Sequence, residues 1–295
     1  MTTVQGPTVG RRRLRTALRR AREAASITQE QVAMSMDWSL SKLIRIESGA
    51  VSVSTNDVKA LLSLYMVTDQ ALIDELVGIA RVARRRTWWS SIRDAVPSPY
   101  ASYIGLEAEA SELCYFQPIN VPGLLQTESY ARSIMPVDGP DQVEPDQADK
   151  RVAIRLTRQR EVLGRERPPE IRTVLDEAVL RRVTGSPEVM HEQLLHLVAL
   201  GNSPNITIQV LPFTAGNNTV NGPFILLRYS DPADTDIVYV ESALFEDLVD
   251  RPDNVGPYQY AFKSLCADSL DPAESLDFIA KVADELRLGA RSLVA

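Results

Sequence analysis

The sequence has few of the residues that metal centres and disulfide frameworks require. Its 295 residues include two cysteines and two histidines. Cys114 and Cys266 are too scattered for a zinc knuckle and too few for a disulfide framework, so we interpret both as small core residues. His191 and His196 are so spaced that on a helix their side chains would point about 140° apart. We therefore expect neither a metal site nor a cofactor.

The motifs that mark common enzyme active sites are missing as well. The sequence contains no G-x-S-x-G, G-x-G-x-x-G, P-loop or H-E-x-x-H pattern. The nearest pair of carboxylates, Glu107 and Glu109, stands on a predicted helix at a spacing where the two side chains do not face each other. We therefore expect that the protein is not an enzyme.

Long apolar runs are absent too. No stretch approaches the roughly 18 apolar residues of a membrane-spanning helix, and the N-terminus leads into an arginine-rich segment instead of a signal peptide. These features predict a cytoplasmic protein without a membrane partner. The length of 295 residues exceeds that of a usual single domain, so we expect two domains.

The negative net charge conceals two parts of opposite sign. The whole chain has a formal charge of −7, yet residues 1–93 hold 15 Lys and Arg against 8 Asp and Glu, which is +7. The remainder holds 17 against 31, which is −14. The basic part is suited to neutralise nucleic-acid phosphates, and a solvated helix face is the alternative for any single arginine.

Helix signals follow one another closely in this basic part. Apolar residues at helical spacing predict a first helix over 10–25, and two short helices joined by a tight turn follow it. Thr28 and Ser39 stand where the N-caps of these short helices belong. A fourth helix should begin at Ser54 or Thr55, and a fifth should run from about 69 to 85. Five helices make a complete small domain.

The second short helix has the pattern of a helix that reads DNA. Leu43 and Ile46 would bury one stripe of it, while Ser41, Lys42 and Arg45 point away. Gly49 should end it. Arginine and lysine on an exposed helix can donate to guanine O6 and N7 in the major groove.

The region resembles the Cro-repressor-like (XRE) helix-turn-helix family. The shared residues are Leu14, Arg22, Thr28-Gln29-Glu30-Gln31-Val32-Ala33, Ser39, Leu43, Arg45-Ile46-Glu47 and Gly49. Two positions depart from the family, because Ser26 and Asp37 stand where glycine is common. The resemblance implies that Gln29 contacts the DNA backbone and that Leu40, Ser41 and Arg45 face base edges. Together with the pattern of the helix, it leads us to expect base contacts from Leu40, Ser41, Lys42 and Arg45, and backbone contacts from Arg19, Arg22, Thr28, Gln29 and Ser39.

The rest of the chain alternates between helix-like and strand-like patterns. Helices are predicted at about 105–114, 125–134, 146–164, 187–201, 257–270 and 272–288, with Pro97 and Pro99 preventing a helix before 104. Runs rich in β-branched and aromatic residues predict strands at 171–175, 206–211, 224–229 and 237–240. The last two should be antiparallel neighbours. The fold class is therefore a mainly α five-helix domain followed by a larger α+β domain.

This second part resembles the large regulatory domain of antitoxin-like developmental regulators of actinobacteria. Its markers are Leu106-Glu107-Ala108-Glu109-Ala110, Pro118, Val121-Pro122-Gly123-Leu124-Leu125-Gln126-Thr127, Tyr130-Ala131-Arg132, Arg155, Arg158-Gln159, Asp176-Glu177-Ala178, Leu180 and Val210-Leu211-Pro212. The resemblance implies a domain that dimerises and receives a signal, often from a small acidic protein encoded nearby.

Two interpretations of one loop stay open. The segment from Val121 to Glu128 reads as a turn that enters a helix. Its residues Pro122, Gly123, Leu124, Leu125, Gln126 and Thr127 either form a buried loop that sets the direction of the helix or form a partner or ligand site.

We divide the chain into a helix-turn-helix domain at 1–86, a connecting segment at 87–103 and a regulatory and dimerisation domain at 104–295.

The leading expectation is a homodimeric transcriptional repressor that binds a palindromic double-stranded DNA operator and associates with the nucleoid when bound. The alternative is an antitoxin-type protein that sequesters a small acidic partner and binds DNA mainly for autoregulation. A sensor of a small molecule is a third reading.

Overall fold

The structure is a computed structural model, and it describes residues 6–49, 51–92, 96, 98–135, 145–216, 220, 222–242 and 245–292. The chain divides into two compact units. Unit 1 comprises Met1–Glu109 with Asp231–Asp234, and unit 2 comprises Ala110–Ser230 with Thr235–Ala295. Among the described residues, no helix is both long enough and apolar enough to cross a membrane.

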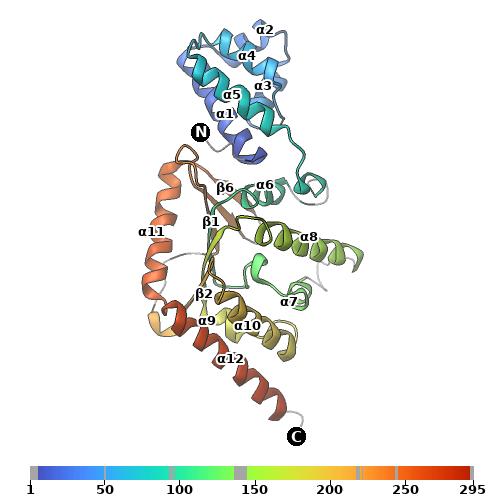
Figure 1. The fold of residues 1–295 in the computed structure, drawn as a ribbon, viewed down its shortest axis with the longest axis vertical. Coiled ribbons are helices and arrows are strands. Elements are labelled where there is room, and N and C mark those ends of the chain that lie inside the picture. The colour runs from blue at the N-terminus through green and yellow to red at the C-terminus, as the bar shows by residue number, and fades with distance from the viewer. Residues whose placement is uncertain are drawn as a thin grey trace. The chain divides into compact units, whose positions relative to one another are not determined.

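Unit 1 contains the five predicted helices, which confirms the helix-turn-helix part of the fold class. They are α1 (Pro7–Ala24), α2 (Gln29–Ser35), α3 (Leu40–Glu47), α4 (Thr55–Leu64) and α5 (Gln70–Ala83) (Figure 1). A single core joins them, in which Leu18, Val32, Leu43 and Leu62 are almost completely buried. The short helix η1 (Trp88–Ser91) and helix α6 (Ser98–Glu107) belong to the same unit.

Four of these helices begin at side-chain caps. The Thr28 hydroxyl accepts the backbone N–H of Gln31, and the Gln31 side chain accepts the N–H of Thr28, which forms a capping box. The Ser39 and Ser54 hydroxyls cap α3 and α4 by accepting the N–H of Lys42 and of Asp57, and the Asp69 carboxylate caps α5. The caps predicted at Thr28 and Ser39 are confirmed, and Ser54 is the cap of the fourth helix.

The prediction of a helix at 105–114 was wrong. Helix α6 begins at Ser98 and ends at Glu107, and strand β1 (Glu112–Gln117) follows it. Pro99 lies in the first turn of α6, where its missing N–H would have no intrahelical partner, so it does not prevent the helix. Pro97 lies outside the described residues. The apolar run in β1 is buried on both faces, and such a short run cannot be distinguished from a helix by its periodicity.

Unit 2 is built on one mixed sheet of six strands. In the order of the sheet these are β3 (Ile206–Leu211), β2 (Glu170–Asp176), β1, β4 (Phe224–Arg228), β5 (Ile237–Glu241) and β6 (Glu246–Val249). Strands β1, β2 and β3 are parallel, and β4 to β6 are antiparallel to their neighbours. The predicted pairing of 224–229 with 237–240 is confirmed, as is the α+β class, whereas β1 and β6 were not predicted as strands.

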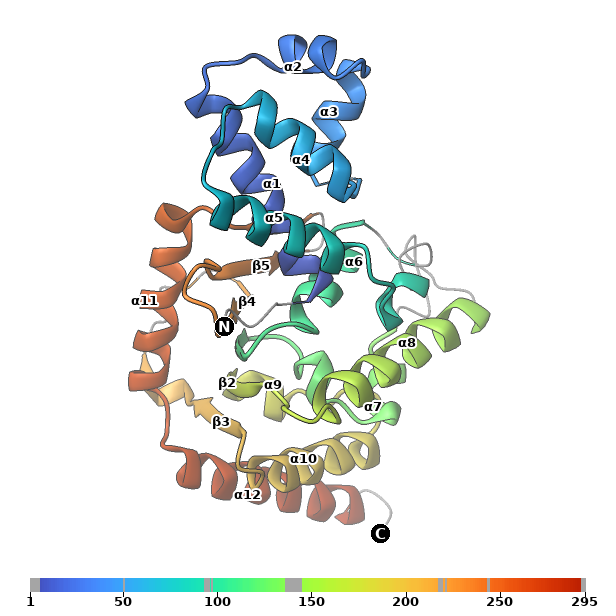
Figure 2. The same ribbon diagram turned by 45° about the horizontal axis from the view of Figure 1, so that its top comes forward.

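Helices cover both faces of this sheet. Helix α11 (Pro252–Asp268) lies along one face, where Phe262 and Leu265 pack against Cys114 and Phe116 of β1. Helices α7 (Glu128–Ser133), α8 (Pro145–Leu163) and α10 (Pro187–Gly201) lie on the other side (Figure 1). Helix α12 (Pro272–Ser292) runs beside α10, as a second view makes clear (Figure 2). The remaining short helices are η2 (Gly123–Leu125), α9 (Glu177–Arg181) and η3 (Phe213–Ala215).

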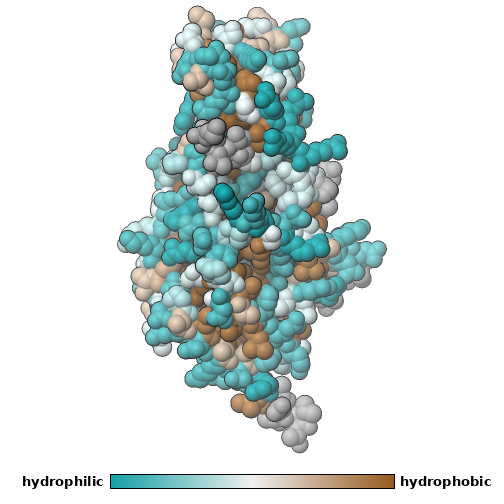
Figure 3. Space-filling view, viewed as in Figure 1, coloured by the Kyte–Doolittle hydropathy of each residue, from teal (hydrophilic) through white to brown (hydrophobic). Residues whose placement is uncertain are grey.

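Hydrophilic residues cover most of the face of unit 2 that Figure 3 presents, and apolar residues emerge between them over α9 and α10. Both cysteines are free thiols: Cys114 is buried and Cys266 is partly buried. Asp176, at the end of β2, caps α9 by accepting the N–H of Ala178.

Candidate nucleic-acid interface

The turn between α2 and α3 has the geometry of a helix-turn-helix even though it lacks glycine. Asp37 has φ 54° and Ser26, just after α1, has φ 56°, so both residues occupy the left-handed region that favours glycine. These are the two positions at which the sequence departs from the XRE family that it resembles. Asp37 and Ser26 therefore adopt the left-handed conformation that glycine would adopt at these positions. The departures from glycine leave the register of α2 and α3 unchanged.

One face of α3 is buried and the other is open. Leu43 and Ile46 are 0% and 4% exposed, and they anchor α3 in the core of unit 1. Ser41 and Arg45 are exposed, Leu40 is 37% exposed and Ile44 is 45% exposed. Helical spacing places these four side chains on a continuous outer face. Sequence reasoning missed Ile44, although its position three residues after Ser41 was a signal for the same face.

Lys42 lies at the edge of this face. Its Nζ atom stands 3.6 Å from the centroid of the Trp38 ring, so the ammonium group makes a cation–π contact in the turn. The side chain is nevertheless exposed. An exposed contact of this kind is worth only about 0.5–1 kcal/mol, so the lysine can exchange it for an acceptor on another molecule.

A carboxylate in α3 ties three helices together. Glu47 accepts a bond of 2.6 Å from Nε of Arg22 in α1 and one of 2.7 Å from the Gln29 amide in α2. Arg22 also donates to the carbonyl oxygen of Ile27. The Arg22 and Glu47 side chains are 12% and 6% exposed. Two side chains predicted to contact the DNA backbone, those of Arg22 and Gln29, are thus engaged inside unit 1.

The surroundings of Glu47 also affect a phenol. Burial, with a smaller effect of the Glu47 charge, raises the pKa of Tyr65 to about 12. Hydrogen bonding to Glu47 raises the pKa of Arg22 in turn. Both shifts keep Tyr65 and Arg22 in one protonation state at neutral pH, so this cluster has a structural function.

The arginines of α1 divide into two groups. Arg13 pairs with Glu75, and Arg15 donates to the carbonyl oxygen of Ser48 at 3.0 Å. Arg19, with 64% of its side chain exposed, makes a surface ion pair with Glu23. Arg20 is exposed and makes no ion pair with any residue in the described ranges. Arg19 follows Arg15 by four residues, which places it on the face of α1 that meets the end of α3.

The loop before α7 is held by amide side chains. Gln159 of α8 donates to the carbonyl oxygens of Gly123 and Gln126. Gln193 of α10 donates to the carbonyl oxygen of Leu125 at 2.8 Å and accepts the N–H of Thr127 at 2.7 Å.

The exposure of this loop matches those bonds. Four of the six residues proposed as a partner or ligand site are buried: Pro122, Leu124, Leu125 and Gln126. Gly123 and Thr127 are partly buried, and Thr127 caps α7. Of the two interpretations, these contacts favour a loop that sets the direction of α7.

Comparison with known families defines the class of protein. A helix-turn-helix domain matches residues 13–76, so unit 1 carries the fold of a DNA-binding regulator. A family described as a domain of unknown function, DUF5753, matches residues 100–281. Because this match covers more than half of the chain, the protein belongs to the DUF5753 family. No curated protein and no solved structure matches the chain.

Proposed function

We propose that the protein is a homodimeric transcriptional repressor that places α3 in the major groove of a palindromic operator. The observation that carries this proposal is the open face of α3, which presents a guanidinium, a hydroxyl and two apolar side chains from a helix anchored in the core. Arginine reads guanine in the major groove, and apolar groups contact the methyl group of thymine.

The base contacts are assigned to Leu40, Ser41, Lys42 and Arg45, and Ile44 joins them because of its exposure. Arg45 supplies the main polar contact, since it has five N–H donors in a fixed fork.

Contacts to the DNA backbone come from Arg19 and from the hydroxyl groups of Thr28 and Ser39. Each of these hydroxyls accepts a backbone N–H in its cap. Ser39 keeps its own hydrogen for a phosphate oxygen, and Thr28, whose hydroxyl also bonds the exposed Glu30 side chain, can exchange that bond for one to a phosphate. Arg22 and Gln29, which also belong to the predicted backbone set, act by holding Glu47 and so fix α3 relative to α1 and α2.

The XRE classification, the dimer and the reception of a signal by unit 2 are parts of the same proposal. Helix-turn-helix readers commonly bind two half-sites about one helical turn apart, which a dimer matches. Sequestration of a small acidic protein is the competing function. The formal charge of −14 on residues 94–295 opposes an acidic partner there.

The test is a genome-wide map of sites occupied by the full-length tagged protein, repeated with Arg45→Ala and with Lys59→Ala as a control on the exposed face of α4. We expect discrete sites that share a two-fold motif, lost in Arg45→Ala and kept in Lys59→Ala. An absence of enriched sites, with a small protein co-purifying instead, would support sequestration. A monomer at micromolar concentration both on and off DNA would contradict the dimer.

A further inference from the structure

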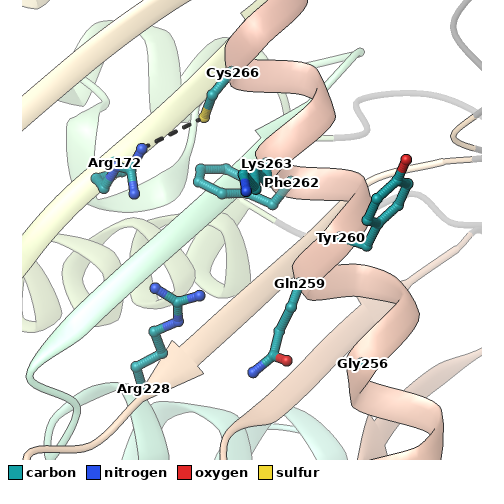
Figure 4. A pocket seen from close by; sticks show the side chains of 8 residues that line it. All are labelled: Arg172, Arg228, Gly256, Gln259, Tyr260, Phe262, Lys263 and Cys266. Atoms are coloured by element: carbon teal, nitrogen blue, oxygen red, sulfur yellow. Dashed lines mark hydrogen bonds between the residues drawn. The ribbon is translucent and has the colours of Figure 1, made fainter.

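A cavity of about 680 Å³ lies within unit 2, between the sheet and α11 (Figure 4). Three basic side chains line it: Arg172 from β2, Arg228 from β4 and Lys263 from α11. Gln259 and Tyr260 add polar groups, and the lining contains no carboxylate. The volume is in the range of small-molecule sites.

The pleat of the sheet and the turn of the helix build this cavity together. Arg172 pairs with Cys114 in the β1–β2 register, and Arg228 pairs with Glu112 in the β1–β4 register, so both arginines lie on the α11 side of the sheet. One face of helix α11, which carries Phe262 and Leu265, packs into the core. The adjacent face of α11, which carries Gln259, Lys263 and Cys266, lines the cavity.

The guanidinium of Arg172 is held in place without a strong acceptor. Its Nη1 is 3.7 Å from the nearest Glu112 oxygen, which is too long for a hydrogen bond, and its Nη2 makes a weak 3.7 Å contact with the sulfur of Cys266. The Phe262 ring supports the group at 5.5 Å. Among the residues described by the structure, no oxygen accepts an N–H from this side chain, which is 43% exposed. The donors are therefore available to a ligand.

The charges around the cavity leave an excess of positive charge. Arg228 is paired closely, with Nη1 at 3.0 Å from Glu112 and Nε at 3.4 Å from Asp236. The amide of Gln259 also donates to Asp236, at 2.7 Å. Lys263 is exposed and forms no ion pair within the described parts of the chain. Three cations thus stand against two carboxylates, Glu112 and Asp236, which leaves a net positive charge at the cavity, and Lys263 has no counter-ion among the described residues.

We propose that this cavity binds a small phosphorylated molecule. A phosphomonoester is an anion at pH 7, which suits the net positive charge of the cavity, and its oxygens suit the planar fork of an arginine. The volume exceeds that of inorganic phosphate and leaves room for an organic group. Binding itself is independent of the function proposed above, whereas control of operator binding by this ligand rests on it.

The test is calorimetric titration of the full-length protein, free of DNA, with phenyl phosphate. We expect saturable binding in the wild type, no binding of phenol, and at least tenfold weaker binding of phenyl phosphate by Arg172→Gln and by Lys263→Gln. Arg182→Gln and Lys281→Gln remove exposed basic side chains elsewhere in unit 2 and should bind within twofold of the wild type. An absence of binding at millimolar phenyl phosphate, or equal affinity in all variants, would overturn the proposal.

The phosphate could instead belong to nucleic acid, so the affinity of Arg172→Gln for random-sequence DNA is measured as well. We expect it to equal that of the wild type. A loss of DNA affinity would identify DNA as the occupant and overturn the assignment to a small molecule. The calorimetry contains no DNA, so the two proposals can fail separately. A genome-wide map without enriched sites would contradict only the repressor function, and a titration without phenyl phosphate binding would contradict only the ligand site in the cavity.

Discussion

Glu47 and Arg22 form a bidentate ion pair that joins α3 to α1, with Nε–Oε1 at 2.6 Å and Nη2–Oε2 at 3.1 Å. Both side chains are nearly buried. Replacing Glu47 by leucine leaves the guanidinium buried without its acceptor and should lower the free energy of unfolding by about 3 kcal/mol. The double variant Arg22→Met with Glu47→Leu should recover most of that loss, because no unpaired charge remains.

Tryptophan fluorescence in urea measures this stability, because Trp38, Trp88 and Trp89 are all the tryptophans of the chain and all lie in unit 1. Glu23→Gln, which breaks the exposed pair with Arg19, is the control and should leave the stability almost unchanged. Additive losses in the double variant would contradict the assignment.

The left-handed conformation at Asp37 predicts a stabilising substitution. Glycine has no Cβ to clash at φ 54°, so Asp37→Gly should raise the stability of unit 1 by about 1 kcal/mol. Ser63→Gly, at an exposed position inside α4, should instead lower it by a similar amount of roughly 0.5–1 kcal/mol. Urea titrations compare the two, and destabilisation by both would mean that Asp37 makes a compensating local contact.

DNA binding should separate base contacts from backbone contacts. Arg45→Ala should relax sequence preference at one base pair by about 1–3 kcal/mol, and Arg19→Ala should weaken binding to all sequences alike and reduce the salt slope by about 1. Ile44→Ala should reduce discrimination for thymine over cytosine at one position, because a methyl contact is lost. Titrations with operator variants at several salt concentrations measure these effects. Equal losses on operator and random DNA for Arg45→Ala would remove it from base readout.

The start of α1 predicts a pH dependence. Gly6 offers no side-chain cap, and the Glu109 carboxylate instead accepts the N–H groups of Thr8 and Val9 at 2.7 and 2.8 Å. Burial outweighs these bonds and raises the pKa of Glu109. The unfolded carboxyl therefore releases its proton first, above about pH 4.3, and the stability conferred by Glu109 falls as the pH rises through its higher folded pKa.

Urea titrations of the wild type and Glu109→Gln between pH 4 and pH 7 test this sign. The stability of the wild type relative to the variant should decline with pH and then become constant. Glu23→Gln is a comparison of opposite sign. The hydrogen bond from Arg19 lowers the pKa of Glu23, so the stability of the wild type relative to Glu23→Gln should rise with pH. A wild-type advantage that grows with pH at Glu109 would show that the hydrogen bonds outweigh burial.

The side-chain amide of Gln193 should contribute strongly to the stability of unit 2. Gln193→Leu leaves the carbonyl of Leu125 and the N–H of Thr127 without their partner, and it should destabilise unit 2 by about 2–4 kcal/mol. Glu192→Leu, at the neighbouring exposed position of α10, is the matched control and should cost far less. Thermal unfolding followed by circular dichroism compares them. A small effect of Gln193→Leu would mean that water replaces both bonds.

Local chemistry explains which elements could be predicted. The caps at Thr28 and Ser39 and the apolar stripe of α3 depend on residues within one turn of each other, so the two helices were evident in the sequence. Strand β1 was mistaken for the end of a helix because it is buried on both faces and shows no alternation. Strand β6 is short and only partly buried, so it lacks an apolar pattern.

The candidate interface likewise combines features that the sequence predicts with features that depend on packing. The exposed positions on α3 follow from helical periodicity, which also covers Ile44 once Leu43 and Ile46 are known to be buried. The engagement of Arg22 and Gln29 by Glu47 could not be read from spacing, because it depends on how three helices pack.

The sequence by itself determined the helix-turn-helix, its caps and the outward face of α3, because these features depend on short-range periodicity and on hydrogen bonds between near neighbours. The tertiary structure alone decided that Glu109 caps α1 and that Arg172, Arg228 and Lys263 line one cavity. Those groups are far apart along the chain, and only sheet register and helix packing bring them together. Long-range placement is a property of the packed core, which no local pattern encodes.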